Sequence, residues 1–97
     1  MSISVIKKQV VPYLKRQGVI KVGIFGSVAR GEQTPRSDID FLLKFGHGIT
    51  LMEMARIKLN LEEKTGRKVD ILTYNGINSK LKKIILDEQK VIYEKRS

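Results

Sequence analysis

Residues 19–45 read VIKVGIFGSVARGEQTPRSDIDFLLKF, and two apolar runs in this stretch decide the fold. The run at 19–25 is short, apolar and rich in β-branched residues, which is typical of a buried strand. The run at 38–45, DIDFLLKF, is also short, and it is mostly apolar after its opening DID. Gly26 and Ser27 end the first run and begin a segment that contains Thr-Pro, which is a turn signal. The stretch predicts two strands joined by a short helical turn and a polar loop.

The segments on either side of this stretch continue the alternation of helix and strand. We expect helices at 3–17, 28–30, 50–65 and 77–85, and strands at 19–25, 38–45, 68–73 and 91–93. Pro12 should kink or break the first helix. Thr50 with Glu53 has the spacing of a capping box, and Gly66 should end the helix that this box begins. The order predicts an α/β (α+β) fold, a small sheet with helices packed on it.

The helix expected at 50–65 is apolar over a wide arc. One stripe consists of Leu51, Met54, Ile57 and Leu61, and a second of Met52, Ala55 and Leu59. Such a helix is usually covered on both sides by its own fold, and a partner chain is the alternative cover.

The composition excludes several classes of protein and site. The chain has 97 residues, 41% of them hydrophobic and 30% charged, which fits one globular domain over 1–97. It has no Cys, which excludes disulfides, and a single His, His47, which excludes a multi-histidine metal site within one chain. No apolar run is long enough for a membrane span and the N-terminus does not look like a signal peptide, so we expect a cytoplasmic location.

The charge is strongly positive, with 19 basic against 10 acidic residues and a formal net charge of +9. A field of this sign attracts nucleic acid, nucleotide phosphates or an acidic protein, and a solvated basic surface accounts for it equally well. Aromatic residues make up only 6% of the chain, so a stacking platform for single-stranded nucleic acid is poorly supported.

Three aspartates interrupt the apolar strands. Asp38 and Asp40 are two residues apart on one expected strand, so their side chains should point to the same face. Asp70 lies in the middle of the strand at 68–73 and faces the same site if the two strands are neighbours. Each of them alone fits a solvated surface charge. Together they favour a site for two hard cations, and oxygen ligands without His or Cys select Mg²⁺ or Mn²⁺.

The turn at Gly26-Ser27 is the second candidate element. A glycine lets the backbone approach a ligand closely, amides that open a helical turn bind phosphate, and Ser27 adds a hydroxyl donor. A Gly-Ser pair alone fits a plain tight turn better. Beside Asp38 and Asp40, however, it supplies the phosphate anchor and metal pair that nucleotidyl transfer from a triphosphate needs. Arg30 is a further candidate for phosphate contact, and a solvated arginine is the alternative.

The segment GSVARGEQTPRSDIDFLLKF, with the later KVDILT and VIYE, resembles the DNA polymerase β-like nucleotidyltransferase superfamily. More narrowly, it is similar to the minimal nucleotidyltransferase (MNT) proteins of bacteria and archaea. The resemblance implies a mixed sheet with packed helices, Mg²⁺ and a nucleoside triphosphate. It assigns Gly26 and Ser27 to the phosphate-binding turn, Asp38 and Asp40 to the metal-binding pair, and Asp70 to the third carboxylate.

The same resemblance implies a function. MNT proteins are commonly paired with HEPN-domain proteins in toxin–antitoxin modules, where the MNT antitoxin transfers AMP from ATP to a tyrosine of the toxin. We therefore expect a Mg²⁺-dependent protein adenylyltransferase with two ions, ATP and a HEPN toxin partner, with which it forms a hetero-oligomer. Asp38 and Asp40 would hold both ions, Asp70 would complete the acceptor-side ion and help deprotonate the hydroxyl, and Gly26-Ser27 would hold the leaving pyrophosphate.

Two other interpretations remain. In the first, the domain is a non-catalytic antitoxin that neutralises its partner by occlusion. In the second, it is a nucleotidyltransferase that acts on RNA. The charge of +9 favours the RNA interpretation, but the chain contains no recognisable RNA-reading module.

Overall fold

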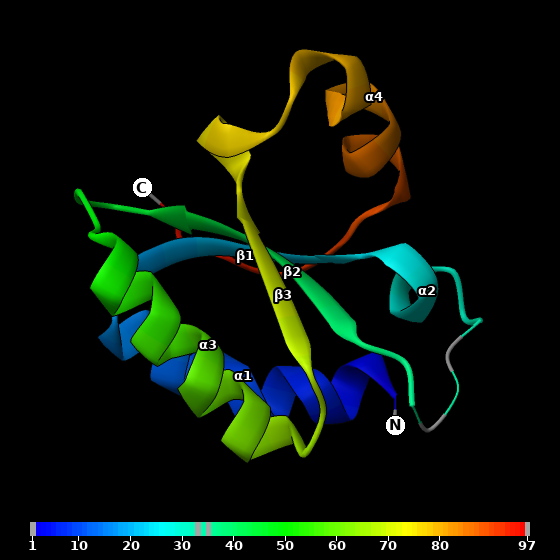
Figure 1. Ribbon diagram of the computed structural model, residues 1–97, viewed down its shortest axis with the longest axis horizontal. Coiled ribbons are helices and arrows are strands. Elements are labelled where there is room, and N and C mark those ends of the chain that lie inside the picture. Colours follow the sequence, from blue (N-terminus) through cyan, green and yellow to red (C-terminus); the bar gives the residue numbers. More distant parts are fainter. Residues whose placement is uncertain (1, 33, 35, 97) are drawn as a thin grey trace.

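A computed structural model describes residues 2–32, 34 and 36–96 as a four-stranded mixed sheet with helices on both faces (Figure 1). The elements in chain order are α1 (Ile3–Arg16), β1 (Val19–Phe25), α2 (Gly26–Ala29), β2 (Ile39–Phe45), α3 (Leu51–Thr65), β3 (Val69–Thr73), the 3₁₀ turn η1 (Tyr74–Gly76), α4 (Ser79–Glu88) and β4 (Lys90–Glu94). The expected fold class is thereby confirmed.

The sheet has the strand order β3-β2-β1-β4. Strand β1 is antiparallel to both β2 and β4, whereas β2 and β3 are parallel. The register pairs Phe25 with Asp40 and Asp40 with Asp70. Because residues paired across neighbouring strands project to the same face, these three form one row across β1, β2 and β3. We call its Asp40–Asp70 part the aspartate row.

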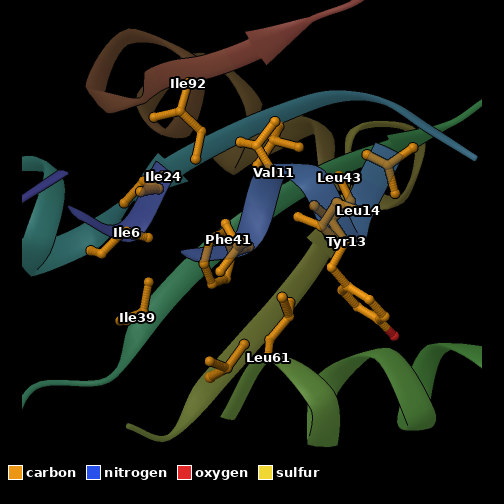
Figure 2. Close-up of a cluster of buried hydrophobic side chains, with 14 of the residues drawn as sticks. Ile6, Val11, Tyr13, Leu14, Ile24, Ile39, Phe41, Leu43, Leu61 and Ile92 are labelled. Atoms are coloured by element: carbon orange, nitrogen blue, oxygen red, sulfur yellow. The ribbon is translucent and has the colours of Figure 1, made fainter. Parts of the chain in front are cut away.

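The hydrophobic core lies between the sheet and the helices α1 and α3, which cover one face (Figures 1 and 2). Alternate residues of β2, among them Ile39 and Phe41, are fully buried in it. Asp40 stands between them in sequence and therefore projects to the opposite face, where α4 lies (Figure 1). The core thus fixes which face of the sheet carries the aspartate row.

Helix α4 is held less firmly than α1 and α3. It contacts α2 and β1, yet none of its residues is buried, and Leu81 and Ile84 are 51% and 62% exposed. An element with so little buried apolar surface has a low local stability against opening.

Two expectations about the helices need correction. Helix α1 runs unbroken through Pro12, whose ring is exposed, because the buried residues Val10, Val11 and Leu14 on either side pack on the sheet. The missing backbone donor therefore costs the helix one hydrogen bond and does not end it.

The second correction concerns α3, because the fold covers only part of one apolar stripe. Ile57 and Leu61 of the first stripe are buried, whereas Leu51 of that stripe is 89% exposed, and Met52 and Leu59 of the second stripe are 79% and 65% exposed. The N-cap of this helix forms as expected, since Thr50 Oγ1 accepts a hydrogen bond of 3.1 Å from the Glu53 N–H. Among the described helices, none has the length and apolarity needed to cross a lipid bilayer.

Candidate active site

The turn after β1 brings the backbone of Gly26 against the side chain of Asp40. Gly26 has φ +74°, and a Cβ built there would overlap the Asp40 carboxylate. Only glycine fits such a turn without strain, because the left-handed backbone and the close contact both exclude a side chain. The Gly26-Ser27 turn and one of the predicted metal ligands are therefore neighbours in space, although 14 positions separate Gly26 from Asp40 along the chain.

Asp40 and Asp70 lie side by side because they are paired in the parallel register of β2 and β3. Asp40 is half-buried, and burial is the main cause that raises its pKa from 3.8 to about 6. The negative charges of Asp70, Asp38 and Glu88 raise this pKa further, and only Arg30 acts in the opposite direction. Three other carboxylates thus act on Asp40, which is itself partly desolvated.

Asp38 is placed differently from the other two aspartates. It precedes β2, which begins at Ile39, and it is exposed. Asp38 lines a small cleft with the basic residues Arg36, Arg67 and Lys68, whereas Asp40 and Asp70 line a larger one. Over residues 2–32, 34 and 36–96, no three His, Cys, Asp or Glu side chains are close enough to hold a metal ion together. The structure brings Asp40 and Asp70 together and leaves Asp38 at the edge of the site.

The larger cleft, of about 550 Å³, opens beside the aspartate row. Its lining combines Asp40 and Asp70 with apolar and basic side chains from β1, α3 and β3: Phe25, Leu51, Met54, Ala55, Lys58, Ile71 and Leu72. One wall is therefore formed by the outward-facing side of α3. An apolar groove with carboxylates in its wall suits a partly apolar substrate whose reacting group is polar.

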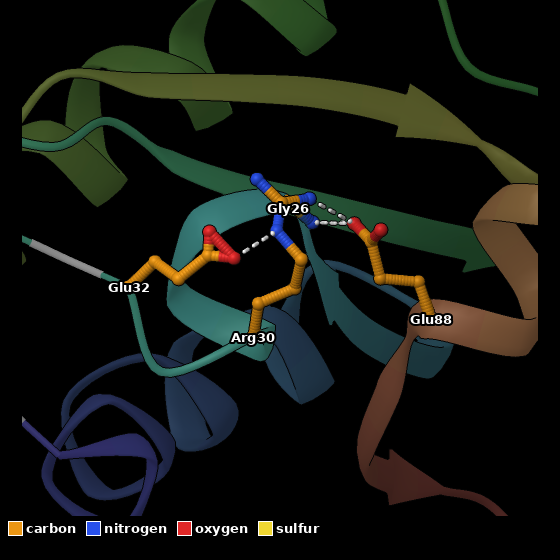
Figure 3. Close-up of polar contacts among 4 residues, drawn as sticks. All are labelled: Gly26, Arg30, Glu32 and Glu88. Atoms are coloured by element: carbon orange, nitrogen blue, oxygen red, sulfur yellow. Dashed lines mark hydrogen bonds and ion pairs between the residues drawn. The ribbon is translucent and has the colours of Figure 1, made fainter.

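The donors of the Gly26 turn are engaged by a residue that sequence reasoning missed, Glu88 at the end of α4. Its Oε1 accepts hydrogen bonds from the Gly26 N–H at 2.6 Å and from Arg30 Nη1 at 3.0 Å (Figure 3). Arg30 also donates through Nε to Glu32 Oε1 at 3.0 Å. These carboxylates raise the pKa of the guanidinium, with Glu88 the larger influence. Arg30 is therefore placed to bind an anion at the turn, and Ser27, half-buried, is the next residue along from Gly26.

The donor set suits a hard divalent cation. The three aspartates offer carboxylate oxygens alone, which is the chemistry that Mg²⁺ and Mn²⁺ prefer. The raised pKa of Asp40 also fits a cation site, because the carboxylate is partly desolvated, which is the main cause, and because the negative charges around it exceed the positive charge that balances them. A cation at Asp40 and Asp70 would supply that balance.

Comparison with known proteins gives consistent matches. The family model described as polymerase beta, nucleotidyltransferase, matches residues 8–97. A Methanocaldococcus jannaschii protein, named as a candidate protein adenylyltransferase, is 49% identical over 88 residues, which are 91% of this chain and 95% of the relative. Protein adenylyltransferase MntA of Thermococcus cleftensis is 34% identical over 79 residues, 81% of this chain and 78% of the relative.

Solved structures share the architecture. A candidate minimal nucleotidyltransferase superposes with a TM-score of 0.79 at 38% identity, covering 93% of this chain and 95% of the other. A toxin–antitoxin complex with AMP-PNP contains a chain that superposes with a TM-score of 0.82 at 16% identity, covering 93% and 74%, and at that identity it shows the fold alone. Because the family model spans nearly the whole chain and the aspartate row lies beside the glycine turn in its fold, this chain belongs to the polymerase β nucleotidyltransferase family.

Proposed function

We propose that this chain is a Mg²⁺-dependent protein adenylyltransferase, which transfers AMP from ATP to a hydroxyl group of another protein. The observation that carries the proposal is the contact between the Gly26 turn and Asp40, with Asp70 beside it in register. This contact joins a phosphate-binding backbone to a carboxylate pair, and nucleotidyl transfer requires both. The relatives named protein adenylyltransferase support the class of acceptor.

The Gly26 turn would hold the triphosphate. The Gly26 N–H and the Arg30 guanidinium already converge on one anionic oxygen, that of Glu88, so the same donors can bind a phosphate oxygen. The Ser27 hydroxyl would add a third donor. These groups would hold the β- and γ-phosphates, and so stabilise the charge that develops on the departing pyrophosphate.

Asp40 and Asp70 would hold the divalent ions, and Asp38 would join them from the edge of the site. Two ions, Mg²⁺ or alternatively Mn²⁺, would neutralise the triphosphate and lower the pKa of the acceptor hydroxyl. Asp70 is exposed at the wall of the larger cleft, where an acceptor can reach it, and would take the hydroxyl proton. The acceptor oxygen then forms a bond to the α-phosphorus, the bond from that phosphorus to the bridging oxygen breaks, and pyrophosphate leaves.

The acceptor would be a separate protein that docks on the exposed side of α3. Leu51 and Met52 are largely solvent-exposed at the N-terminal end of this helix, and Leu51 also lines the cleft that contains Asp40 and Asp70. An apolar patch of this kind marks an interaction surface. A HEPN toxin presenting a tyrosine fits this site, since a solved complex of the same fold contains a tri-AMPylated HEPN toxin with its MNT antitoxin. The chain would then act in the cytoplasm as the antitoxin of a hetero-oligomer, with residues 1–97 as one minimal nucleotidyltransferase domain.

Label transfer tests the reaction directly. The purified chain, Mg²⁺ and a HEPN protein encoded next to it are incubated with ATP labelled at the α- or the γ-phosphate. We expect label on the acceptor from α-labelled ATP only, and loss of at least a hundredfold in rate for Asp40→Asn and for Asp38→Asn with Asp40→Asn. Asp87→Asn, an equal charge change on the exposed side of α4, serves as the control. Transfer from γ-labelled ATP, or full activity in the double variant, would rule out the mechanism.

A non-catalytic antitoxin and an RNA-directed enzyme predict different results. A purely occluding domain would inhibit its partner equally with and without ATP, and Mg²⁺-ATP would leave its melting temperature unchanged. An RNA-directed enzyme would label RNA, and its affinity for RNA would fall steeply with salt concentration. The net charge of +9 is the observation that favours RNA as an acceptor.

A further inference from the structure

The carboxylate of Glu88 occupies the donors that the proposed function assigns to the triphosphate. Glu88 Oε1 lies 2.6 Å from the Gly26 nitrogen and 3.0 Å from Arg30 Nη1 (Figure 3). Glu88 is 62 positions away from Gly26 along the chain, so this contact is built by the tertiary fold. The Glu88 side chain is only 23% exposed, about half as much as that of Arg30.

For these donors, a carboxylate oxygen and a phosphate oxygen are equivalent acceptors. Both are anionic acceptors, and a backbone N–H directs its single hydrogen to one acceptor at a time. A phosphate oxygen on Gly26 therefore has to displace Glu88. If Glu88 stayed nearby, its charge would repel the triphosphate, as it already acts against ionisation of Asp40.

We propose that Glu88 is an autoinhibitory residue that competes with the nucleotide triphosphate for Gly26 and Arg30. The inference rests on the proposed function, because it takes these two groups as the triphosphate anchor. The competing group belongs to the chain itself, so apparent nucleotide affinity is reduced by the fraction of molecules in which Glu88 is bound. The site is thereby kept closed until Glu88 leaves it.

The packing of α4 allows Glu88 to leave. Glu88 is the last residue of α4, a helix with no buried residue, and Gln89 separates it from β4. Opening of α4 would therefore expose little core, while β4 would stay paired with β1. Nucleotide binding and the position of α4 are in this way coupled, and a ligand that holds α4 away from the turn would activate the enzyme.

The test measures binding separately from catalysis. The equilibrium dissociation constant for a non-hydrolysable ATP analogue with Mg²⁺ is measured for the full chain by calorimetry. If Glu88 is bound in about 70–90% of molecules, Glu88→Gln and Glu88→Ala should bind the analogue roughly three- to tenfold more tightly. Asp87→Asn, with the same charge change on the same helix, should bind like the wild type. Glu32→Gln removes the other carboxylate on Arg30 but leaves Gly26 engaged, so it should give a much smaller gain.

A measurement on the wild type covers the case in which the variants fold poorly. The chemical shift of the Glu88 carboxyl carbon is followed while Mg²⁺ and the analogue are added, and it should move to the value of a free, solvated carboxylate. Weaker or unchanged binding in the Glu88 variants, or a Gly26–Glu88 hydrogen bond that persists in the nucleotide complex, overturns the inference. Absence of binding in the wild type and all variants would overturn the proposed function as well. Tight binding without label transfer would contradict the reaction only.

Discussion

Asp40 on β2 and Asp70 on β3 are directly paired across a parallel ladder, and the carboxylate of Asp40 also touches the backbone of Gly26. A strand interior that pairs two acids works against the stability of the fold, since like charges face each other on one side of the sheet. Burial of Asp40, and after it these like charges, raise its pKa to about 6, which reports the cost of ionising this carboxyl in the folded protein. The fold carries this cost beside the Gly26 turn, where we propose the nucleotide site.

Replacing Asp40 should stabilise the metal-free protein. A carboxyl whose folded pKa lies near 6 and whose unfolded pKa is 3.8 favours folding below pH 4, and this contribution is lost as the pH rises through 6. Asp40→Asn should therefore raise the free energy of unfolding at pH 8 by roughly 1 kcal/mol, the value being reduced by solvent screening because Asp40 is only partly buried. At pH 4 the gain should nearly vanish. Urea denaturation at the two pH values measures it, and a gain independent of pH would show that charge is not its source.

Magnesium should offset the destabilisation that the ionised Asp40 causes in the wild type. An ion bound by Asp40 and Asp70 stabilises the folded state by mass action, by about 2.7 kcal/mol at a hundredfold excess over its dissociation constant. The rise in melting temperature should shrink between pH 7.5 and pH 5, because protons compete with the ion for Asp40. Asp70→Asn should lose most of the rise. An equal rise in Asp40→Asn would mean that the ion binds elsewhere.

Gly26 and Gly31 form a matched pair of substitutions. Both have φ +74°, but a Cβ at Gly31 meets no atom of the described residues within 4 Å, whereas a Cβ at Gly26 overlaps the Asp40 carboxylate. Gly31→Ala should thus cost only the left-handed strain, about 1–2 kcal/mol, and leave nucleotide binding intact. Gly26→Ala should cost more and abolish nucleotide binding. Thermal unfolding and calorimetry give both quantities, and equal losses in the two variants would contradict the close approach at Gly26.

The secondary structure could be predicted because its signals are local. The strand at 19–25 has the expected bounds, Thr50 caps α3, and Gly66 ends that helix. The parallel pairing of β2 with β3 is a long-range property. The residues alone therefore do not show whether Asp40 and Asp70 are neighbours. The family resemblance supplied that neighbourhood; periodicity could not.

Two features of the site could not be predicted for identifiable reasons. Glu88 has no motif of its own, and it reaches Gly26 because β4 pairs antiparallel with β1, with Lys90 opposite Ile24. The alternation of side chains along a strand predicts that Asp38 faces the same way as Asp40. Strand β2 begins at Ile39, however, so Asp38 lies outside the strand and this alternation does not apply to it. Register and strand ends are set by tertiary pairing, which a single sequence does not contain.

The exposed apolar side of α3 should govern the acceptor and leave the nucleotide unaffected. Leu51 is 89% exposed, so Leu51→Lys should leave the free energy of unfolding nearly unchanged. If a protein acceptor buries Leu51 beside the cleft, the substitution should raise the KM for that acceptor roughly tenfold, the equivalent of about 1.4 kcal/mol of lost apolar burial. The KM for ATP should stay constant. Val5→Lys, on the exposed side of α1, is the control. A rise in both KM values, or an equal effect of Val5→Lys, would place the acceptor elsewhere on the molecule.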